Sequence, residues 1–259
     1  MPVILQDSLP FAPWMQAATA RLPGIQPIAM ADWVQVDEAY GAQLDEKARL
    51  LAHQREAVLA EAPDAHAASG ELLALVLEQL GRRNDFDVVG DHVVRPDGVS
   101  TLVNRDTPLE TLASLVQEDV AILMKDGDEH VLRAALICFP ASWSLAEKIG
   151  RPLAAIHAPV DSYAPQMARR VQRLFDASRA GKPLMRANAL RYVDPELFQP
   201  RRFGDAKPIE PGAPAFMRSE RQTILRLPKT GAVVFTIHTY VVAWGDLTDA
   251  QRAGWQASG

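Results

Sequence analysis

Two apolar β runs joined by a tight-turn sequence form the framework of this chain. Val120–Met124 and Val131–Phe139 are rich in β-branched and other apolar residues, and the segment between them contains the pair Asp126-Gly127. Asp-Gly between apolar runs is a strong hairpin signal, because a type I′ turn needs positive φ at both central residues. We therefore predict an antiparallel hairpin at the centre of the fold.

Three further stretches have the composition of strands, and several others have the periodicity of helices. The last two strands are separated only by Pro-Lys-Thr-Gly, so we expect them to form a second hairpin. The predicted strands are 184–192, 221–227 and 232–243, and the predicted helices are about 37–60, 69–81, 107–116, 143–149 and 163–177.

The order of these elements predicts an α+β fold. We expect one antiparallel sheet of five to six strands, covered on one face, with flanking helices and an N-terminal helical layer. Residues 1–82 would form an extended segment and that helical layer, and residues 83–259 one compact unit that holds the sheet. A Gly90-Asp91 turn between short apolar runs predicts an additional small hairpin.

The composition excludes several classes of function. The formal net charge of −5 lacks the surplus of Lys and Arg that neutralises phosphates, so we expect no nucleic-acid partner. The single cysteine, Cys138, leaves no disulfide framework and no cysteine-based zinc or iron–sulfur site within the chain. No stretch approaches the roughly 20 apolar residues that span a bilayer, and the first residues lack a signal-peptide pattern. We therefore expect a cytoplasmic protein without membrane contact.

His157 lies in a rigid, apolar stretch of the chain. The preceding amphipathic segment stops at Gly150, Pro152 fixes the backbone that follows, and Pro159 closes the apolar run around the histidine. One interpretation is a core histidine that is hydrogen-bonded to backbone. The other is a metal or haem ligand, because neutral imidazole beside an apolar pocket suits haem iron. The residues alone leave both open.

Other side chains with possible chemistry have simpler interpretations. Cys138 alternates within a buried strand and is expected to be a core residue, with a thiolate haem ligand as the alternative. His53 and His66 lie among polar residues and are expected at the surface. His238 is expected at a cross-strand or exposed position on the last strand.

Four long segments resemble the haem-binding alpha subunit of the haem-dependent oxidative N-demethylases. They are Ala31–Leu51, Trp143–Val160, Phe216–Thr223 and Thr230–Val241. The resemblance covers nearly the whole chain. It implies a PAS-like fold that binds haem b and, with O2, oxidises small secondary or tertiary methylamines and releases formaldehyde. It also implies that a separate NADPH-dependent reductase with FMN and a 2Fe–2S cluster supplies the electrons.

The resemblance also suggests roles for individual residues. It makes His157 the iron ligand, and it places Tyr163 and Glu220 on the opposite side, near the amine and O2. Glu220 has a simpler alternative, a salt bridge at a strand end with a neighbouring arginine. Three arginines are candidates for the haem propionates, because guanidinium matches carboxylate in fork geometry: Arg186, Arg218 and Arg221.

Two other functions remain compatible with the sequence. A haem-binding PAS-like sensor would bind the cofactor without turnover. An interaction module without haem would contain only a packed core around His157. No output domain is recognised after the last strand, which weighs against a sensor.

Overall fold

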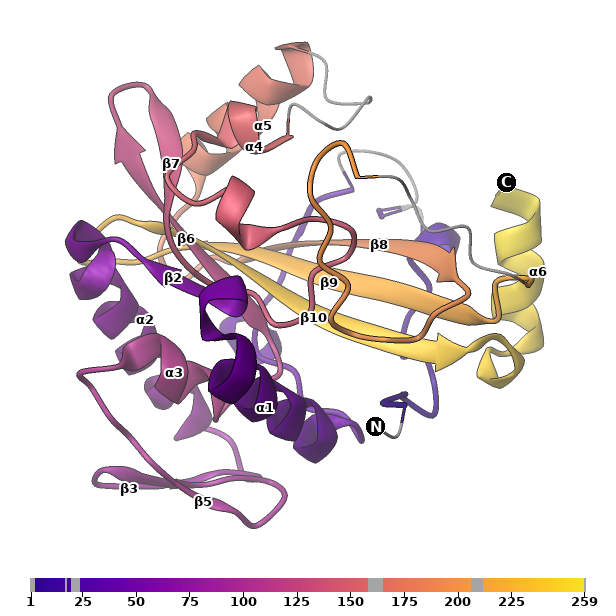
Figure 1. Cartoon of the computed structure of the whole chain (residues 1–259), viewed down its shortest axis with the longest axis horizontal. Helices are drawn as coiled ribbons and strands as arrows, with labels where there is room; N and C mark the ends of the chain where they lie inside the picture. The colour runs from indigo at the N-terminus through magenta and orange to yellow at the C-terminus, as the bar shows by residue number, and fades with distance from the viewer. Residues whose placement is uncertain (1–2, 17, 20–23, 158–164, 206–211, 259) are drawn as a thin grey trace.

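The computed structural model describes residues 3–16, 18–19, 24–157, 165–205 and 212–258, with the side chains of 157, 165–169 and 258 left aside. Its main feature is a seven-stranded antiparallel sheet in the order β1-β8-β9-β10-β6-β7-β2 (Figure 1). The strands are β1 Gln26–Pro27, β2 Leu59–Glu61, β6 Asp119–Asp126, β7 Glu129–Leu136, β8 Leu184–Tyr192, β9 Phe216–Arg226 and β10 Val233–Ala243. A second, three-stranded sheet contains β3 Asp87–Val89, β4 His92–Val94 and β5 Ser100–Leu102.

Helices lie on both sides of the large sheet (Figure 1). They are α1 Tyr40–Val58, α2 His66–Leu80, α3 Pro108–Ala113, α4 Leu153–His157, α5 Pro165–Ala177 and α6 Asp249–Ser258. The first three lie on one side, and α4 and α5 lie on the other. The prediction of a single sheet covered on one face is therefore wrong, whereas the mixed architecture around a large antiparallel sheet is confirmed. In the described part of the chain, no helix is long and apolar enough to cross a membrane.

Each face of the sheet has its own apolar core. On the α2 face, Leu72 and Leu73 of α2 belong to one buried cluster with Ile122 and Val234 of the sheet. On the α5 face, the buried cluster includes Leu153 of α4 and Phe175 of α5, and the strand residues Leu123, Ile224 and Val233. Complete burial of such a side chain contributes about 1.5–3 kcal/mol, so the two clusters fix both helical layers on the sheet.

The predicted hairpins are confirmed. Strands β6 and β7 meet at Gly127, whose φ of 58° is the left-handed conformation that the Asp-Gly signal anticipated. Strand β8 has the predicted bounds, and β9 pairs with β10 without interruption from Arg226 with Val233 to Phe216 with Ala243. Strand β9 begins five residues earlier than predicted, because its polar residues alternate between two interior faces and so lack a simple apolar pattern.

The predicted helix 143–149 is wrong. Only a 3-10 turn, η4, forms at Leu145–Glu147, and the chain then runs alongside β7. Gly150 donates its N–H to the carbonyl of Leu132 at 2.8 Å, and Leu132 donates to the carbonyl of Arg151 at 3.1 Å. Gly150 has a φ of 74°, which breaks the helix and allows this pairing.

The helix predicted after Thr107 is confirmed in part. It begins at Pro108, as expected for proline in the first turn, and ends at Ala113, before the predicted end. Thr107 and Glu110 have the spacing of a capping box, but the Thr107 side chain makes no capping hydrogen bond.

Candidate functional site

Strand alternation divides the polar residues of β9 between the two faces of the sheet. Arg221 lies opposite His238 of β10, on the α2 face. Glu220 lies opposite Asn188 of β8, and Gln222 lies opposite Arg186, both on the α5 face. The arginines and the carboxylate proposed from the sequence are therefore not all brought together: Arg186 accompanies Glu220, and Arg221 does not.

Glu220 is the centre of a polar group on the α5 face. Its side chain is 13 % exposed. The amide nitrogens of Asn188 and Gln222 donate to its Oε2 at 3.3 and 3.0 Å. The Nε of Arg218 lies 3.9 Å from its Oε1, so the simpler interpretation of an ion pair with a neighbouring arginine is met, although within β9 and not at its end. The two amides hold the carboxylate in one orientation in the middle of the strand.

Arg186 lies on the same face without a hydrogen bond from its side chain to any described residue. Its Nε is fully buried and has no acceptor. Burial lowers the pKa of Arg186, and the carboxylate of Glu220 only partly offsets this effect. Arg186 as a whole is half-buried, but a buried Nε without an acceptor among the described residues is unusual, because buried charged groups normally find a counter-charge or acceptors.

Lys148, which the sequence did not single out, is close enough to Glu220 to be attracted by its carboxylate. It follows the turn η4, and its Nζ lies 4.2 Å from the ring centroid of Trp143. Burial lowers the pKa of Lys148 to about 8, against the attraction of Glu147 and Glu220. We call Lys148, Arg186, Asn188, Glu220 and Gln222 the Glu220 cluster.

Half-buried apolar side chains lie on the same face of the sheet as the Glu220 cluster. Phe235 of β10, Trp143, Ile149 and Ile156 of α4 are half-buried and pack against the core of the α5 face. Leu190, farther along β8 on the same face, is 59 % exposed. The α5 face is thus closed over β6 and β7 but is partly accessible over β8, which is where the charged residues lie.

Arg218 and Arg221 use their guanidinium groups to hold the fold. Arg218 donates to the carbonyl oxygens of Phe139 at 2.7 Å and Leu197 at 3.1 Å. Arg221 donates to the carbonyl oxygens of Trp33 at 3.0 Å and Asp32 at 2.5 Å. Both side chains are buried, so their hydrogen bonds tie loops to β9.

Replacing Arg218 by alanine should lower the free energy of unfolding by about 2 kcal/mol, because two buried carbonyl oxygens lose their donors. Urea unfolding of the purified chain, followed by circular dichroism, measures this effect. The matched control is Arg173→Ala, since Arg173 lies exposed on α5. Equal stability of both variants would contradict the structural role of Arg218.

The remaining predicted site residues lie at or beyond the end of α4. His157 is the last residue of α4, and its side chain lies outside the described part of the structure. Tyr163 lies outside the described residues altogether. Helix α4 itself is on the α5 face, where Leu153 is buried and Ile156 packs against the same core. The backbone of His157 therefore belongs to the same side of the sheet as Glu220 (Figure 1).

His238 is fully buried on the α2 face and lies opposite Arg221 of β9, so it takes the predicted cross-strand position and not the exposed alternative. Its Nε2 lies 2.9 Å from Oδ2 of Asp37, and its Nδ1 lies 3.2 Å from Oε1 of Glu118. Burial alone would lower the pKa of His238, but these hydrogen bonds and charges raise it to about 9. His238 is therefore a buried imidazolium between two carboxylates. By contrast, His53 and His66 are exposed and Cys138 is buried, as predicted.

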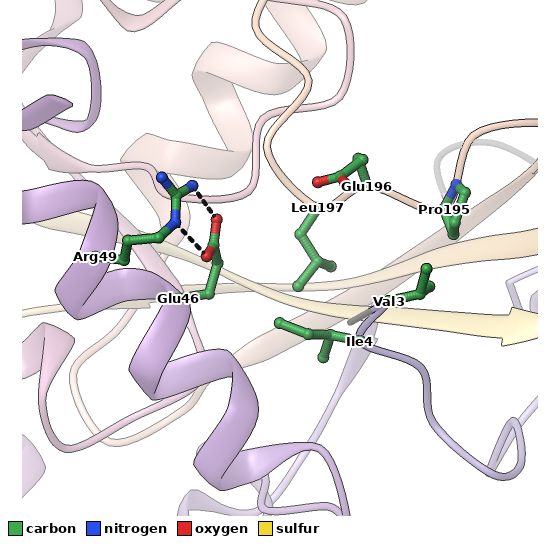
Figure 2. Close-up of a pocket in the computed structure, with 7 residues that line it drawn as sticks. All are labelled: Val3, Ile4, Glu46, Arg49, Pro195, Glu196 and Leu197. Atoms are coloured by element: carbon green, nitrogen blue, oxygen red, sulfur yellow. Dashed lines mark hydrogen bonds and ion pairs between the residues drawn. The ribbon is translucent and has the colours of Figure 1, made fainter. Parts of the chain in front are cut away.

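A hollow of about 170 Å³ lies between α1 and the loop after β8, and no residue of the Glu220 cluster lines it (Figure 2). It is lined by Val3, Ile4, Glu46, Arg49, Pro195, Glu196 and Leu197. Arg49 and Glu46 form a two-pronged ion pair at 2.6 and 2.7 Å along its wall. Small-molecule and cofactor sites usually enclose roughly 300–1,000 Å³, so this hollow does not fit a large cofactor.

A family model described as haem-dependent oxidative N-demethylase, alpha subunit-like, matches residues 24–257. The chain belongs to this family. The match extends from before β1 to the last turn of α6, and it confirms the resemblance found in the sequence. The description of the family names haem dependence, oxidative removal of N-methyl groups and a subunit of a larger assembly.

The described residues on the α5 face fit the haem that this family's description names. Haem combines a flat apolar ring with two carboxylates. The half-buried Phe235 and Ile156 offer apolar contact, and Arg186, whose buried Nε lacks an acceptor, offers a carboxylate partner. The described residues contain no group of three or more metal-ligating side chains. Haem iron needs no such group, because one axial histidine suffices.

Proposed function

We propose that this chain binds haem b on the α5 face and catalyses oxidative N-demethylation of small secondary or tertiary methylamines similar to dimethylamine. The family match over residues 24–257 carries this proposal. Support from the fold is the polar, partly accessible Glu220 cluster on the same side of the sheet as α4. The reaction would be of the monooxygenase type and would take place in the cytoplasm.

The proposed reaction requires a partner that supplies electrons. One amine, one O2, two electrons and two protons would give the demethylated amine, one formaldehyde and one water. We propose that the electrons come from NADPH through a separate reductase that carries FMN and a 2Fe–2S cluster. The subunit named in the family's description is consistent with such an assembly.

We also propose a finer description of the fold. The antiparallel sheet with flanking helices would be PAS-like, and residues 1–82 would form a helical layer on residues 83–259. Strands β1 and β2 belong to the first 82 residues and pair with β8 and β7. The layer would therefore be an integral part of the sheet and not an independent unit.

When bound, haem supplies the iron centre for O2 chemistry, and the residues of the chain would place the substrate. Glu220 would attract a methylammonium group, since its carboxylate is fixed by Asn188 and Gln222. The same carboxylate could take a proton from the ammonium nitrogen, which gives the amine its free electron pair. Tyr163 would contribute an aromatic face for the cation.

His157 would be the iron ligand, and Arg186 would contact a propionate. We favour Arg186 over Arg218 and Arg221, because the latter two already donate to backbone carbonyl oxygens. Arg186 has no such acceptor among the described residues. Only Arg186 of the three can therefore gain a counter-charge without loss of an existing contact.

Absorption spectroscopy tests the proposal. The purified chain, as isolated or after addition of haemin, should give a Soret band, and His157→Ala should weaken haem affinity at least about tenfold. His66→Ala is the matched control, because His66 is exposed. With a competent reductase, dimethylamine should yield formaldehyde.

The outcomes separate the candidate functions. Absence of a Soret band after haemin addition would overturn the proposal and favour an interaction module without haem. A Soret band without formaldehyde would instead favour a haem-binding sensor. Equal haem affinity of His157→Ala and the wild type would remove His157 from the site.

A further inference from the structure

Lys148 is a half-buried lysine whose ammonium group has no anion or carbonyl partner among the described residues. Its neighbour is the ring of Trp143, at 4.2 Å from Nζ to the ring centroid. A cation over an aromatic face gains about 0.5–2 kcal/mol, which is less than the several kcal/mol that removing a charge from water costs. The Nζ of Lys148 is not one of the fully buried atoms that lack a partner, so a further anion can reach it.

Another buried lysine in the same protein shows what a purely structural role requires. Lys47 of α1 is fully buried, and its Nζ donates to the carbonyl of Glu118 at 2.6 Å and lies 3.2 Å from Asp119. Lys148 has neither kind of contact. The fold thus provides hydrogen-bond acceptors for Lys47, whereas the described residues provide none for Lys148.

Lys148 and Arg186 are both attracted by the carboxylate of Glu220, but neither forms an ion pair with it. Glu220 attracts both cations electrostatically, but no ion pair within 4 Å joins it to either of them in the described structure. Its Oε2 already accepts from Asn188 and Gln222. The nearby Glu147 accepts instead from the backbone N–H of Phe203 at 3.1 Å. The half-buried Lys148 and Arg186, the latter with a fully buried Nε, are therefore left without an anion or hydrogen-bond acceptor among the described residues.

We propose that Lys148 and Arg186 together bind the two carboxylates of one ligand, the propionates of haem. This inference rests on the proposed function and adds Lys148, which lies in a turn that the sequence predicted to be helical. The Trp143 ring lies against the ammonium group of Lys148, and Arg186 belongs to β8, so the two positive groups come from different elements. The propionates would satisfy Lys148 and Arg186, so that Arg218 would be the remaining described cation beside Glu220 when a cationic substrate binds.

Titrations with haemin and with haemin dimethyl ester test this assignment, since the ester lacks both carboxylates. The full-length chain, Lys148→Met, Lys148→Arg, Arg186→Gln and the double variant Lys148→Met/Arg186→Gln are compared by Soret absorbance. Methionine keeps an apolar stem over Trp143, which protects the fold. The matched control is Lys229→Met, since Lys229 is exposed in the turn between β9 and β10.

The wild type should bind haemin about 100-fold more tightly than the ester. Lys148→Met should bind haemin about tenfold more weakly than the wild type and should bind the ester as tightly as the wild type does. Lys148→Arg should retain the preference, and the double variant should bind both porphyrins equally. If Lys148→Met weakens haemin and ester to the same extent, or weakens neither, the assignment is overturned. If the wild type binds neither porphyrin, the proposed function itself fails.

Discussion

Replacement of His238 by leucine should lower the free energy of unfolding by about 3–5 kcal/mol. The imidazolium lies between Asp37 and Glu118, at 2.9 and 3.2 Å, and its side chain is 0 % exposed. Leucine would leave two buried carboxylates without their cation, and removal of one member of a buried charged group costs more than the group itself contributes. Urea unfolding at pH 6 measures this loss, and His66→Leu, at an exposed position, is the control.

The pH dependence of this difference provides a second measurement. The folded pKa of His238 is raised from 6.5 to about 9, so its contribution is complete below pH 6.5 and is lost as the pH rises through 9. Burial alone would raise the pKa values of Asp37 and Glu118, but His238 and their other donors lower them below 3.8 and 4.5. Their contributions are therefore present above these values and are lost in acid.

The stability difference between wild type and His238→Leu should thus be largest between about pH 5 and 6.5 and should shrink towards pH 10. A difference that is constant from pH 6 to pH 10 would show that His238 acts through its shape and not through its charge.

The sequence predicted the strands well because their signals are local. The Asp-Gly turn at Gly127 and the bounds of β8 need only neighbouring residues. The partners of His238 are not local: Glu118 is 120 residues away and Asp37 is 201 residues away. No spacing rule connects positions so distant, so the cross-strand position of His238 was predictable but its two carboxylate partners were not.

The candidate site was predictable in part. Alternation along β9 alone separates Arg221 from Glu220, so the sequence held the information that excludes Arg221 from the Glu220 cluster. The unpaired state of Arg186 was not predictable, since it depends on the absence of acceptors from several elements. Lys148 was missed because residues 143–149 have a helical pattern, whereas tertiary pairing of Gly150 with Leu132 shortens the helix to one turn.

Replacement of Lys47 by methionine should also cost about 3–5 kcal/mol, because it leaves the Asp119 carboxylate alone in the interior. The two side chains are 0 % and 1 % exposed and lie 3.2 Å apart. Lys47 also donates to the carbonyl of Glu118 at 2.6 Å, and this acceptor would lose its partner as well. The control on the same helix is Arg49→Met, whose ion pair with Glu46 is partly exposed and contributes little.

The pH dependence of Lys47→Met should have the opposite sign to that of an ordinary paired carboxylate. Burial already raises the pKa of Asp119, although Lys47 and the backbone N–H groups of Phe139 and Cys138 oppose this effect. Without Lys47 the folded pKa rises further, so the folded variant takes up a proton as the pH falls and regains stability. The deficit measured by urea unfolding should therefore be smaller at pH 5 than at pH 8.

The double variant Lys47→Met/Asp119→Asn should be more stable at pH 8 than Lys47→Met, because the amide removes the unpaired charge and still accepts from Phe139. Equal instability of the two variants at pH 8 would show that packing of the lysine stem, and not the charge of Asp119, accounts for the loss.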